Sequence, residues 1–122
     1  MVSKKKPNNI YIEVKIMKLF DIYGRLDINE NLKEYDAAEN AVLLDVRSEE
    51  EYAKGHIPNS KNVPVEVIDK AGKFINSENA QVFVYCKSGN RSSMASEALK
   101  SMGYKNVKNI GGINDYSGKV EC

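Results

Sequence analysis

Short apolar runs that end in a polar residue recur along the chain and predict the strands of its fold. Residues 82–85 form a fully apolar run, Val-Phe-Val-Tyr, directly before a cysteine. A run without polar alternation is typical of a strand that is buried on both faces of a parallel sheet. Residues 42–45, Val-Leu-Leu-Asp, have a similar character, so we expect a second strand there, and we expect the last clear strand at residues 107–110.

Helix signals separate the predicted strands. Ser48 is followed three residues later by Glu51, which makes a capping box and marks the start of a helix. Gly103 is expected to stop the last helix, because glycine favours the position just after a helix end. The expected helices cover residues 29–38 (capped by Asn29 or Asn31), 48–55, 65–71 and 92–102, and the last should bury Met94, Ala95, Ala98, Leu99 and Met102.

Strands that alternate with helices are typical of a parallel sheet with crossover helices. We therefore predict an α/β fold, with a central, mostly parallel sheet of about five strands and helices on both faces. Residues 1–16 are expected to be an N-terminal extension, partly disordered, in which residues 10–16 could form an edge strand. The domain itself is expected to span residues 17–122.

Cys86 ends the apolar run of residues 82–85, at the edge of the sheet where open α/β folds bind ligands. The helix that follows directs its free N–H groups and its partial positive charge towards this edge, which favours ionisation of a thiol. We therefore predict an ionised, accessible thiolate at Cys86. The candidate loop and supporting residues are Lys87, Ser88, Gly89, Asn90, Arg91 and Ser92.

Composition limits the remaining possibilities. The 122 residues carry a net charge of +1, which favours neither nucleic acid nor membrane as a partner. Two cysteines are too few for a disulfide scaffold, which favours a reduced, cytoplasmic location. One histidine and two cysteines at unrelated positions do not form a zinc set, so no metal site is expected. A signal peptide needs a continuous apolar stretch after its first basic residues, and here that stretch is interrupted, so no signal peptide is expected.

Three separated stretches resemble one known family. They are CKSGNRS at residues 86–92, LLDVRSEEEYAKGHIPNSKNVP at residues 43–64, and Gly103-Tyr104 with NVKNIGGIND at residues 106–115. Their order and content resemble the single-domain rhodanese-like sulfurtransferases over residues 27–118. Asn59 departs from the glycine that is usual in the family, and Tyr116 from a tryptophan. Asparagine tolerates a left-handed turn, and tyrosine keeps an aromatic packing surface.

The resemblance implies a sulfur-transfer role. Cys86 would carry a persulfide, which the backbone N–H groups of residues 87–91 would cradle. The donor would be a small sulfur anion such as thiosulfate, a polysulfide or a persulfide, and the acceptor a thiol, cyanide or a protein. No soluble cofactor would be required. Arg91 would brace the loop or screen incoming charge, and the exposed Lys87 would attract an anionic donor.

Three residues outside the loop are candidates for supporting roles. Asp45 and Arg47 stand at the carboxyl end of a predicted strand, where an ion pair or a loop brace is expected. His56, in the Gly-His-Ile-Pro turn, is expected to bond neighbouring backbone. Activation of Cys86 should then rest on amides, the helix dipole and cations.

Two alternative functions remain open at the level of sequence. Cysteine phosphatases and arsenate reductases also place a thiolate in a loop of amides, but related phosphatase loops have five residues between cysteine and arginine. Here four residues separate Cys86 from Arg91. The second alternative is a non-catalytic sulfur carrier or binding module.

Overall fold

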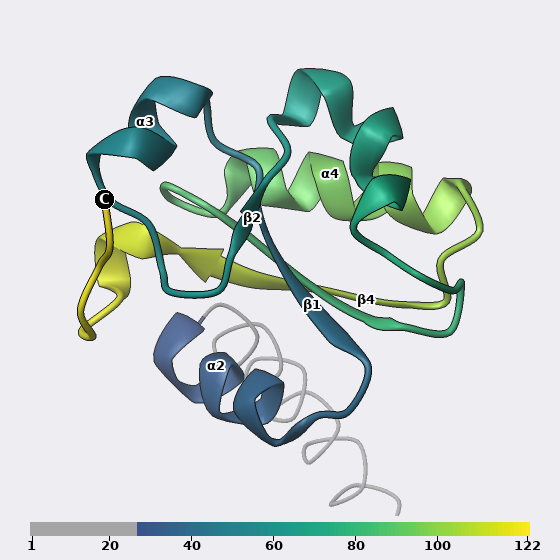
Figure 1. The fold of residues 1–122 in the computed structure, drawn as a ribbon, viewed down its shortest axis with the longest axis horizontal. Helices are drawn as coiled ribbons and strands as arrows, with labels where there is room; N and C mark the ends of the chain where they lie inside the picture. Colours follow the sequence, from purple (N-terminus) through teal and green to yellow (C-terminus); the bar gives the residue numbers. More distant parts are fainter. Residues whose placement is uncertain (1–26) are drawn as a thin grey trace, which may run out of the picture.

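The computed structural model describes residues 27–122, which form a sheet of four parallel strands (Figure 1). In the order in which they lie side by side, the strands are β2 (Lys61–Asn62), β1 (Ala41–Asp45), β3 (Gln81–Cys86) and β4 (Asn106–Gly112). The predicted α/β fold with a parallel sheet is confirmed. We expected about five strands; the candidate strand at residues 10–16, like the rest of the extension, lies outside the described residues.

Helices cover both faces of this sheet, as predicted. They are α2 (Ile28–Ala37), α3 (Glu49–Lys54), α4 (Asn90–Ser101) and two 3-10 helices, η2 (Val65–Lys73) and η3 (Ile113–Asp115). α2 lies on one face, while α4 and η2 lie on the other (Figure 1). The loop between β3 and α4 is thereby placed at the carboxyl edge of the sheet.

The two central strands supply apolar side chains to both faces. On the α2 side, Leu43, Phe83 and Tyr85 are buried with Ile28. On the α4 side, the buried cluster contains Leu44, Val46, Val82, Val84, Cys86, Ala95 and Leu99. Successive residues of a strand point to opposite faces, so an unbroken apolar run fills both cores. The interpretation of residues 82–85 as a fully buried strand is confirmed.

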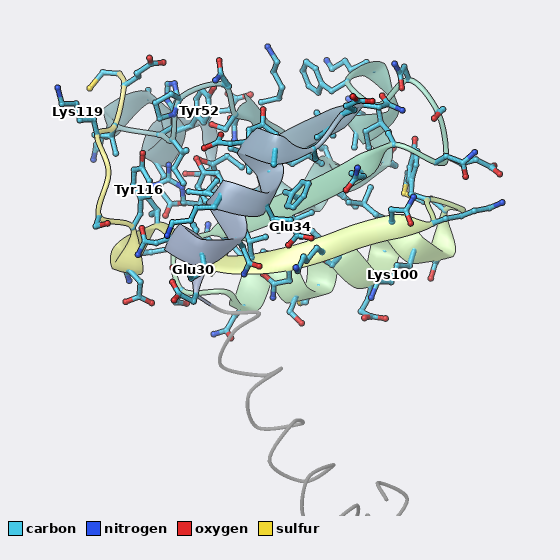
Figure 2. The ribbon with its side chains drawn as sticks, turned by 90° about the horizontal axis from the view of Figure 1, so that it is seen from below. Glu30, Glu34, Tyr52, Lys100, Tyr116 and Lys119 are labelled. Atoms are coloured by element: carbon cyan, nitrogen blue, oxygen red, sulfur yellow. The ribbon has the colours of Figure 1, made fainter. Side chains whose placement is uncertain are left out.

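The N-cap of α2 differs from the predicted one. Asp27 is the N-cap, and its carboxylate accepts hydrogen bonds from the N–H groups of Asn29 and Glu30. The prediction that Asn29 or Asn31 caps the helix was wrong, because Asp27, directly before the first helical residue Ile28, already accepts hydrogen bonds from the free N–H groups. Glu34, which is labelled on α2 in Figure 2, forms an ion pair with Lys108, and this pair joins α2 to β4.

α4 also differs from its prediction. It begins at Asn90 and ends at Ser101, and its buried face is made of small residues and one leucine: Ser92, Ala95, Ser96 and Leu99. Met94 is 60% exposed and Met102 is 42% exposed, so their predicted burial was wrong.

β4 contains an irregularity beside the cysteine loop. Val84 pairs with Asn109, whereas the next residue, Tyr85, pairs with Gly111, so one residue of β4 bulges out of the register. The pairing then continues between Cys86 and Gly112. The predicted strand end at residue 110 was therefore too early. A bulge of this kind re-aims neighbouring side chains and is common beside active sites.

Both departures from the family pattern are accommodated as expected. Asn59 adopts φ of 73°, which is the left-handed conformation that glycine usually provides. Tyr116 packs against the hydrophobic cluster on the α2 side. Its hydroxyl donates to the carbonyl of Lys119 at 2.9 Å.

Candidate functional site: a cysteine in an amide-lined loop

Cys86 is the last residue of β3 and lies beneath the loop that leads to α4. Only 1% of the residue is exposed, so the expected accessibility of the thiol at the loop mouth was wrong. The reason is the course of the backbone, which turns back over the sulfur at Gly89. Gly89 itself is buried, whereas the side chains of Lys87, Ser88 and Asn90 are exposed around it. A reacting molecule must therefore reach the sulfur past the loop backbone.

The sulfur of Cys86 is held by hydrogen-bond donors. The Gly89 N–H donates to Sγ at 3.0 Å, and the Ser92 hydroxyl lies 3.4 Å from it. Burial raises the pKa of the Cys86 thiol, but hydrogen bonds from the Ser92 hydroxyl and from the N–H groups of Ser92, Gly89 and Ser88 outweigh burial and lower it below its ordinary value. The arrangement therefore favours a thiolate.

Gly89 gives the loop its shape. Its φ of 106° lies in the region that side-chain-bearing residues rarely adopt, and it occupies the N-cap position of α4. This conformation directs the Gly89 N–H at the sulfur three residues back. The N-terminus of α4 also brings its partial positive charge to the same point. A glycine in this loop is thus needed for the backbone donor.

Arg91, near the start of α4, forms an ion pair with Glu51 on α3. Two parallel hydrogen bonds of 2.7 and 3.0 Å join the guanidinium to the carboxylate. The Glu51 N–H donates to the Ser48 hydroxyl, and the Ser48 N–H donates to the Glu51 carboxylate. These two hydrogen bonds form the predicted capping box. The geometry is that of a brace between α3 and the loop, one of the two roles expected for Arg91.

Asp45 and Arg47 form a buried ion pair at the carboxyl end of β1. The shortest contact, between Arg47 Nη2 and Asp45 Oδ2, is 2.7 Å. Arg47 also donates from Nη2 to the Gly55 carbonyl at 2.7 Å, which fixes the end of α3. Burial lowers the pKa of Arg47, but the Asp45 carboxylate more than compensates, and the pKa is raised. The pair is adjacent to the cysteine strand, since Asp45 pairs with Tyr85 in the sheet.

His56 lies in the turn after α3, and its ring is occupied locally. Nδ1 lies 2.8 Å from the Tyr52 carbonyl, and the imidazole stacks on the Tyr52 ring with centroids 3.7 Å apart. The expected bond to neighbouring backbone is confirmed.

Gly112 allows β4 to approach the cysteine loop. A Cβ at this position would collide with the Lys87 carbonyl oxygen and would lie 2.6 Å from Ser88 Cα. The backbone of Gly112 is extended, with φ of −126° and ψ of 146°, which any residue can adopt. Glycine is therefore needed here for space alone. The Asn114 N–H fastens the loop further by donating to the Lys87 carbonyl at 3.1 Å.

We expect Gly112→Ala to lower the rate of the reaction at Cys86 by roughly 100-fold, because displacing the loop by about 1 Å misaligns its donors. The unfolding free energy should fall by about 1–3 kcal/mol through overpacking. Steady-state kinetics of the reaction at Cys86 measure the first effect, and urea unfolding measures the second. Gly72→Ala is the matched control, since its Cβ would meet only the Tyr104 hydroxyl at 3.2 Å. Equal rates for Gly112→Ala and the wild type would contradict this role for Gly112.

The Glu51 brace should be visible in the pH dependence of stability. Arg91, despite the opposing effect of burial, lowers the pKa of Glu51 to about 2. A depressed carboxyl pKa stabilises the fold above the unfolded value near 4.5, and the stabilisation is lost as pH falls through about 2. Glu51→Gln should therefore cost about 1 kcal/mol at neutral pH, and much less near pH 2. Urea unfolding of Glu51→Gln and of the control Glu50→Gln at several pH values tests this; a cost that is independent of pH would contradict it.

Among residues 27–122, no group of three or more His, Cys, Asp or Glu side chains is placed to hold a metal ion. Within the same residues, no helix combines the length and apolarity that are needed to span a bilayer.

Sequence reasoning missed three residues that shape the site. Glu51 was recognised as part of a capping box, but its contact with Arg91 was not predicted. Gly112 was named only as part of the stretch NVKNIGGIND at residues 106–115, with no role of its own. Asn109, whose side-chain oxygen lies 2.7 Å from the Ser92 hydroxyl, carried no signal in the sequence.

The fold and this loop define the class of α/β domains that hold a cysteine in an amide-lined loop at the carboxyl end of a parallel strand. Within that class, the chain belongs to the rhodanese-like domain family, whose model matches residues 28–119. General sulfur transfer is the activity that the family supports, because its named relatives are sulfurtransferases or sulfur carriers.

Two relatives illustrate this range. A protein of Bacillus subtilis named as a candidate sulfur carrier, YrkF, is 40% identical over 87 residues, which are 70% of this chain and 46% of the relative. The thiosulfate sulfurtransferase PspE of Escherichia coli is 38% identical over 73 residues, which are 59% of this chain and 70% of the relative. The chain thus spans less than half the length of the Bacillus protein.

Among solved structures, a rhodanese with anions from Escherichia coli has a TM-score of 0.62 and 32% identity to this chain. The match covers 66% of this chain and 96% of that one. The predicted rhodanese-like fold is confirmed.

Proposed function

We propose that the protein is a sulfurtransferase that carries sulfane sulfur as a persulfide on Cys86. The observation that carries the proposal is the Gly89 N–H at 3.0 Å from Sγ, within a loop whose donors lower the pKa of the buried thiol despite desolvation. A thiolate at neutral pH is the nucleophile that attack on a sulfur donor requires.

The reaction proceeds in two displacements. The Cys86 thiolate attacks the outer sulfur of thiosulfate; a bond forms between Sγ and that sulfur, the sulfur–sulfur bond of the donor breaks, and sulfite leaves with the bonding pair. A polysulfide or an organic persulfide would donate in the same way. The acceptor, which is cyanide, a thiol or a partner protein, then attacks the outer sulfur of the persulfide. The Cys86 thiolate leaves with the bonding pair and is restored.

The loop supplies what these steps need. The N–H groups of Ser88, Gly89 and Ser92 stabilise negative charge at the sulfur, as an anion-binding nest does. Arg91 braces the loop through Glu51, and the exposed Lys87 attracts an anionic donor. Asp45 and Arg47 hold the neighbouring loop. We assign this activity to a domain of residues 17–122 in the cytoplasm, with no cofactor.

A sulfur-carrier role is the second candidate, and the burial of Cys86 favours it. A sulfur reached only past the loop backbone could be loaded and unloaded by a dedicated protein and remain slow with small molecules. A phosphatase or arsenate reductase is the less favoured alternative, because Arg91 is held by Glu51 and the loop has only four residues between Cys86 and Arg91.

The test is the mass of the protein after exposure to thiosulfate and removal of the donor. We expect a gain of one sulfur atom on the peptide that contains Cys86, discharged by cyanide as thiocyanate. Cys122→Ser should gain the same sulfur, since Cys122 is exposed and lies far along the chain in the tail. Absence of an adduct with thiosulfate, polysulfide and an organic persulfide would instead favour a non-catalytic binding module, and phosphate-ester hydrolysis without sulfur transfer would favour the phosphatase.

A further inference from the structure

The Ser92 hydroxyl has more acceptors around it than it can serve. Its oxygen lies 2.7 Å from Asn109 Oδ1, 3.1 Å from the Gly89 carbonyl and 3.4 Å from Cys86 Sγ. A serine hydroxyl has a single hydrogen, so it can donate to one of the three at a time. Asn109 Oδ1 is the nearest of these acceptors. Whatever holds the hydrogen near Asn109 withholds it from the sulfur.

The Asn109 amide has a defined orientation. The Gly111 N–H donates to Asn109 Oδ1 at 3.0 Å, and Nδ2 donates to the Gly89 carbonyl at 3.3 Å. A flipped amide would place its NH2 group against the Gly111 N–H, so the oxygen must face Ser92 and Gly111. The bulge after Asn109 creates this geometry, because it brings the Gly111 N–H back to the side chain two residues earlier.

The Gly89 carbonyl is a weaker competitor for the Ser92 hydrogen. It already accepts the Ser93 N–H at 3.1 Å as the first bond of α4, in addition to the Asn109 amide. A carbonyl oxygen has two lone pairs, and these two donors occupy them. The choice for Ser92 is therefore chiefly between Asn109 Oδ1 and Cys86 Sγ.

We propose that Asn109 is a positioning residue that competes with the sulfur of Cys86 for the hydroxyl hydrogen of Ser92. When Sγ is neutral, as a thiol or as the inner sulfur of a persulfide, the hydroxyl points to Asn109. When Sγ carries the charge, as the free thiolate or as the leaving group, the hydroxyl turns to the sulfur, since a charged acceptor binds more strongly. The proton stays on Ser92 throughout. This role in the reaction cycle rests on the proposed function.

The charged groups near the sulfur do not take part in this competition. Arg91 on α4 is held by Glu51, and Asp45 and Arg47 at the end of β1 are paired with each other. Lys87 is exposed to solvent. The side chains of these five residues form no hydrogen bond with the side chain of Asn109 or Ser92. We therefore expect a change in the pKa of Cys86 in these variants to report the hydrogen bonds to the sulfur.

The experiment measures the pKa of Cys86 from the ultraviolet absorbance of its thiolate, in a Cys122→Ser background so that one thiol reports. Asn109→Ala should lower the pKa, because the competing acceptor is gone. Asn109→Asp should raise it, because a carboxylate holds the Ser92 hydrogen more firmly. Opposite shifts from one position separate a positioning role from structural damage, which would move both variants the same way.

Repeating the titrations in a Ser92→Ala background decides whether Asn109 acts through the Ser92 hydroxyl. It should raise the pKa of Cys86 through loss of the donor, and adding Asn109→Ala should then cause no further shift. An equal shift from Asn109→Ala with and without Ser92 would overturn the proposal, as would shifts of the same sign for alanine and aspartate. Should Asn109→Ala fail to fold, the rise caused by Asn109→Asp must be smaller in the Ser92→Ala background, and an equal rise would overturn the proposal.

These titrations need no sulfur donor, so their outcome is independent of the proposed function. If the wild type gains no sulfur on Cys86 but the pKa shifts follow the expected pattern, the competition for the hydrogen stands and the transfer activity fails. If the wild type gains sulfur and the shifts do not follow the pattern, the activity stands and the role of Asn109 fails.

Discussion

Cys86→Ser is expected to reduce sulfur transfer by a thousandfold or more, to the level of the uncatalysed reaction. A serine hydroxyl is not ionised at neutral pH and cannot form a persulfide, so neither displacement can occur. The substitution replaces one atom by a smaller one in a residue that is 1% exposed, and it should leave the fold intact. The predicted loss therefore concerns the chemistry alone.

The measurement is the rate of thiocyanate formation from thiosulfate and cyanide, with unfolding by urea as a check on the fold. Cys122→Ser, at the exposed second cysteine, is the matched control and should retain the wild-type rate. Substantial transfer by Cys86→Ser would show that another group carries the sulfur, and would refute the proposed function even if the fold is unchanged.

Arg47→Met should cost about 3–5 kcal/mol of unfolding free energy, the largest effect on stability that we expect. Asp45 has no exposed surface, and the substitution leaves its carboxylate in the core without the guanidinium, although the backbone N–H of residue 47 still donates to it at 2.9 Å. The hydrogen bond from the guanidinium to the Gly55 carbonyl is lost as well. The connection between β1 and α3 should loosen, and with it the Glu51 brace.

Urea unfolding of three variants measures this cost. Asp45→Asn with Arg47→Met should recover part of the loss, because no uncompensated charge then remains in the core. Lys33→Met is the matched control at a surface pair, where Lys33 and Glu30 are 74% and 63% exposed, and it should cost less than about 1 kcal/mol. Similar losses for Arg47→Met and Lys33→Met would show that the buried pair contributes little.

Much of the fold could be predicted from the sequence, because its central strands are unusually clear. The run that ends at Cys86 has no polar alternation, and only a strand covered on both faces accommodates such a run. The capping box at Ser48 and the left-handed turn at Asn59 were also predictable, since each depends on local chemistry. The two-residue strand β2 was not, because its pairing with β1 is set by the rest of the sheet.

The site was predictable only where it is contiguous in the sequence. Cys86 and its loop form one segment, so their proximity follows from the chain itself. Glu51 and Asn109 reach the loop from α3 and β4, and their positions depend on how those elements pack. The burial of the sulfur was missed for a related reason: the loop closes over Cys86 because Gly112 lets β4 approach it, a contact between segments that are 24 residues apart or more.

The enclosed position of the sulfur decides what can exchange with it. A molecule that gives or takes sulfur must bring its reacting atom past the loop backbone to the sulfur. Whether it can react therefore depends on the width of the part that carries this atom. Slender donors and acceptors, or a protein that presents its sulfur on a thin extended arm, satisfy this requirement. A thiol set in a broad rigid surface does not, however reactive it is.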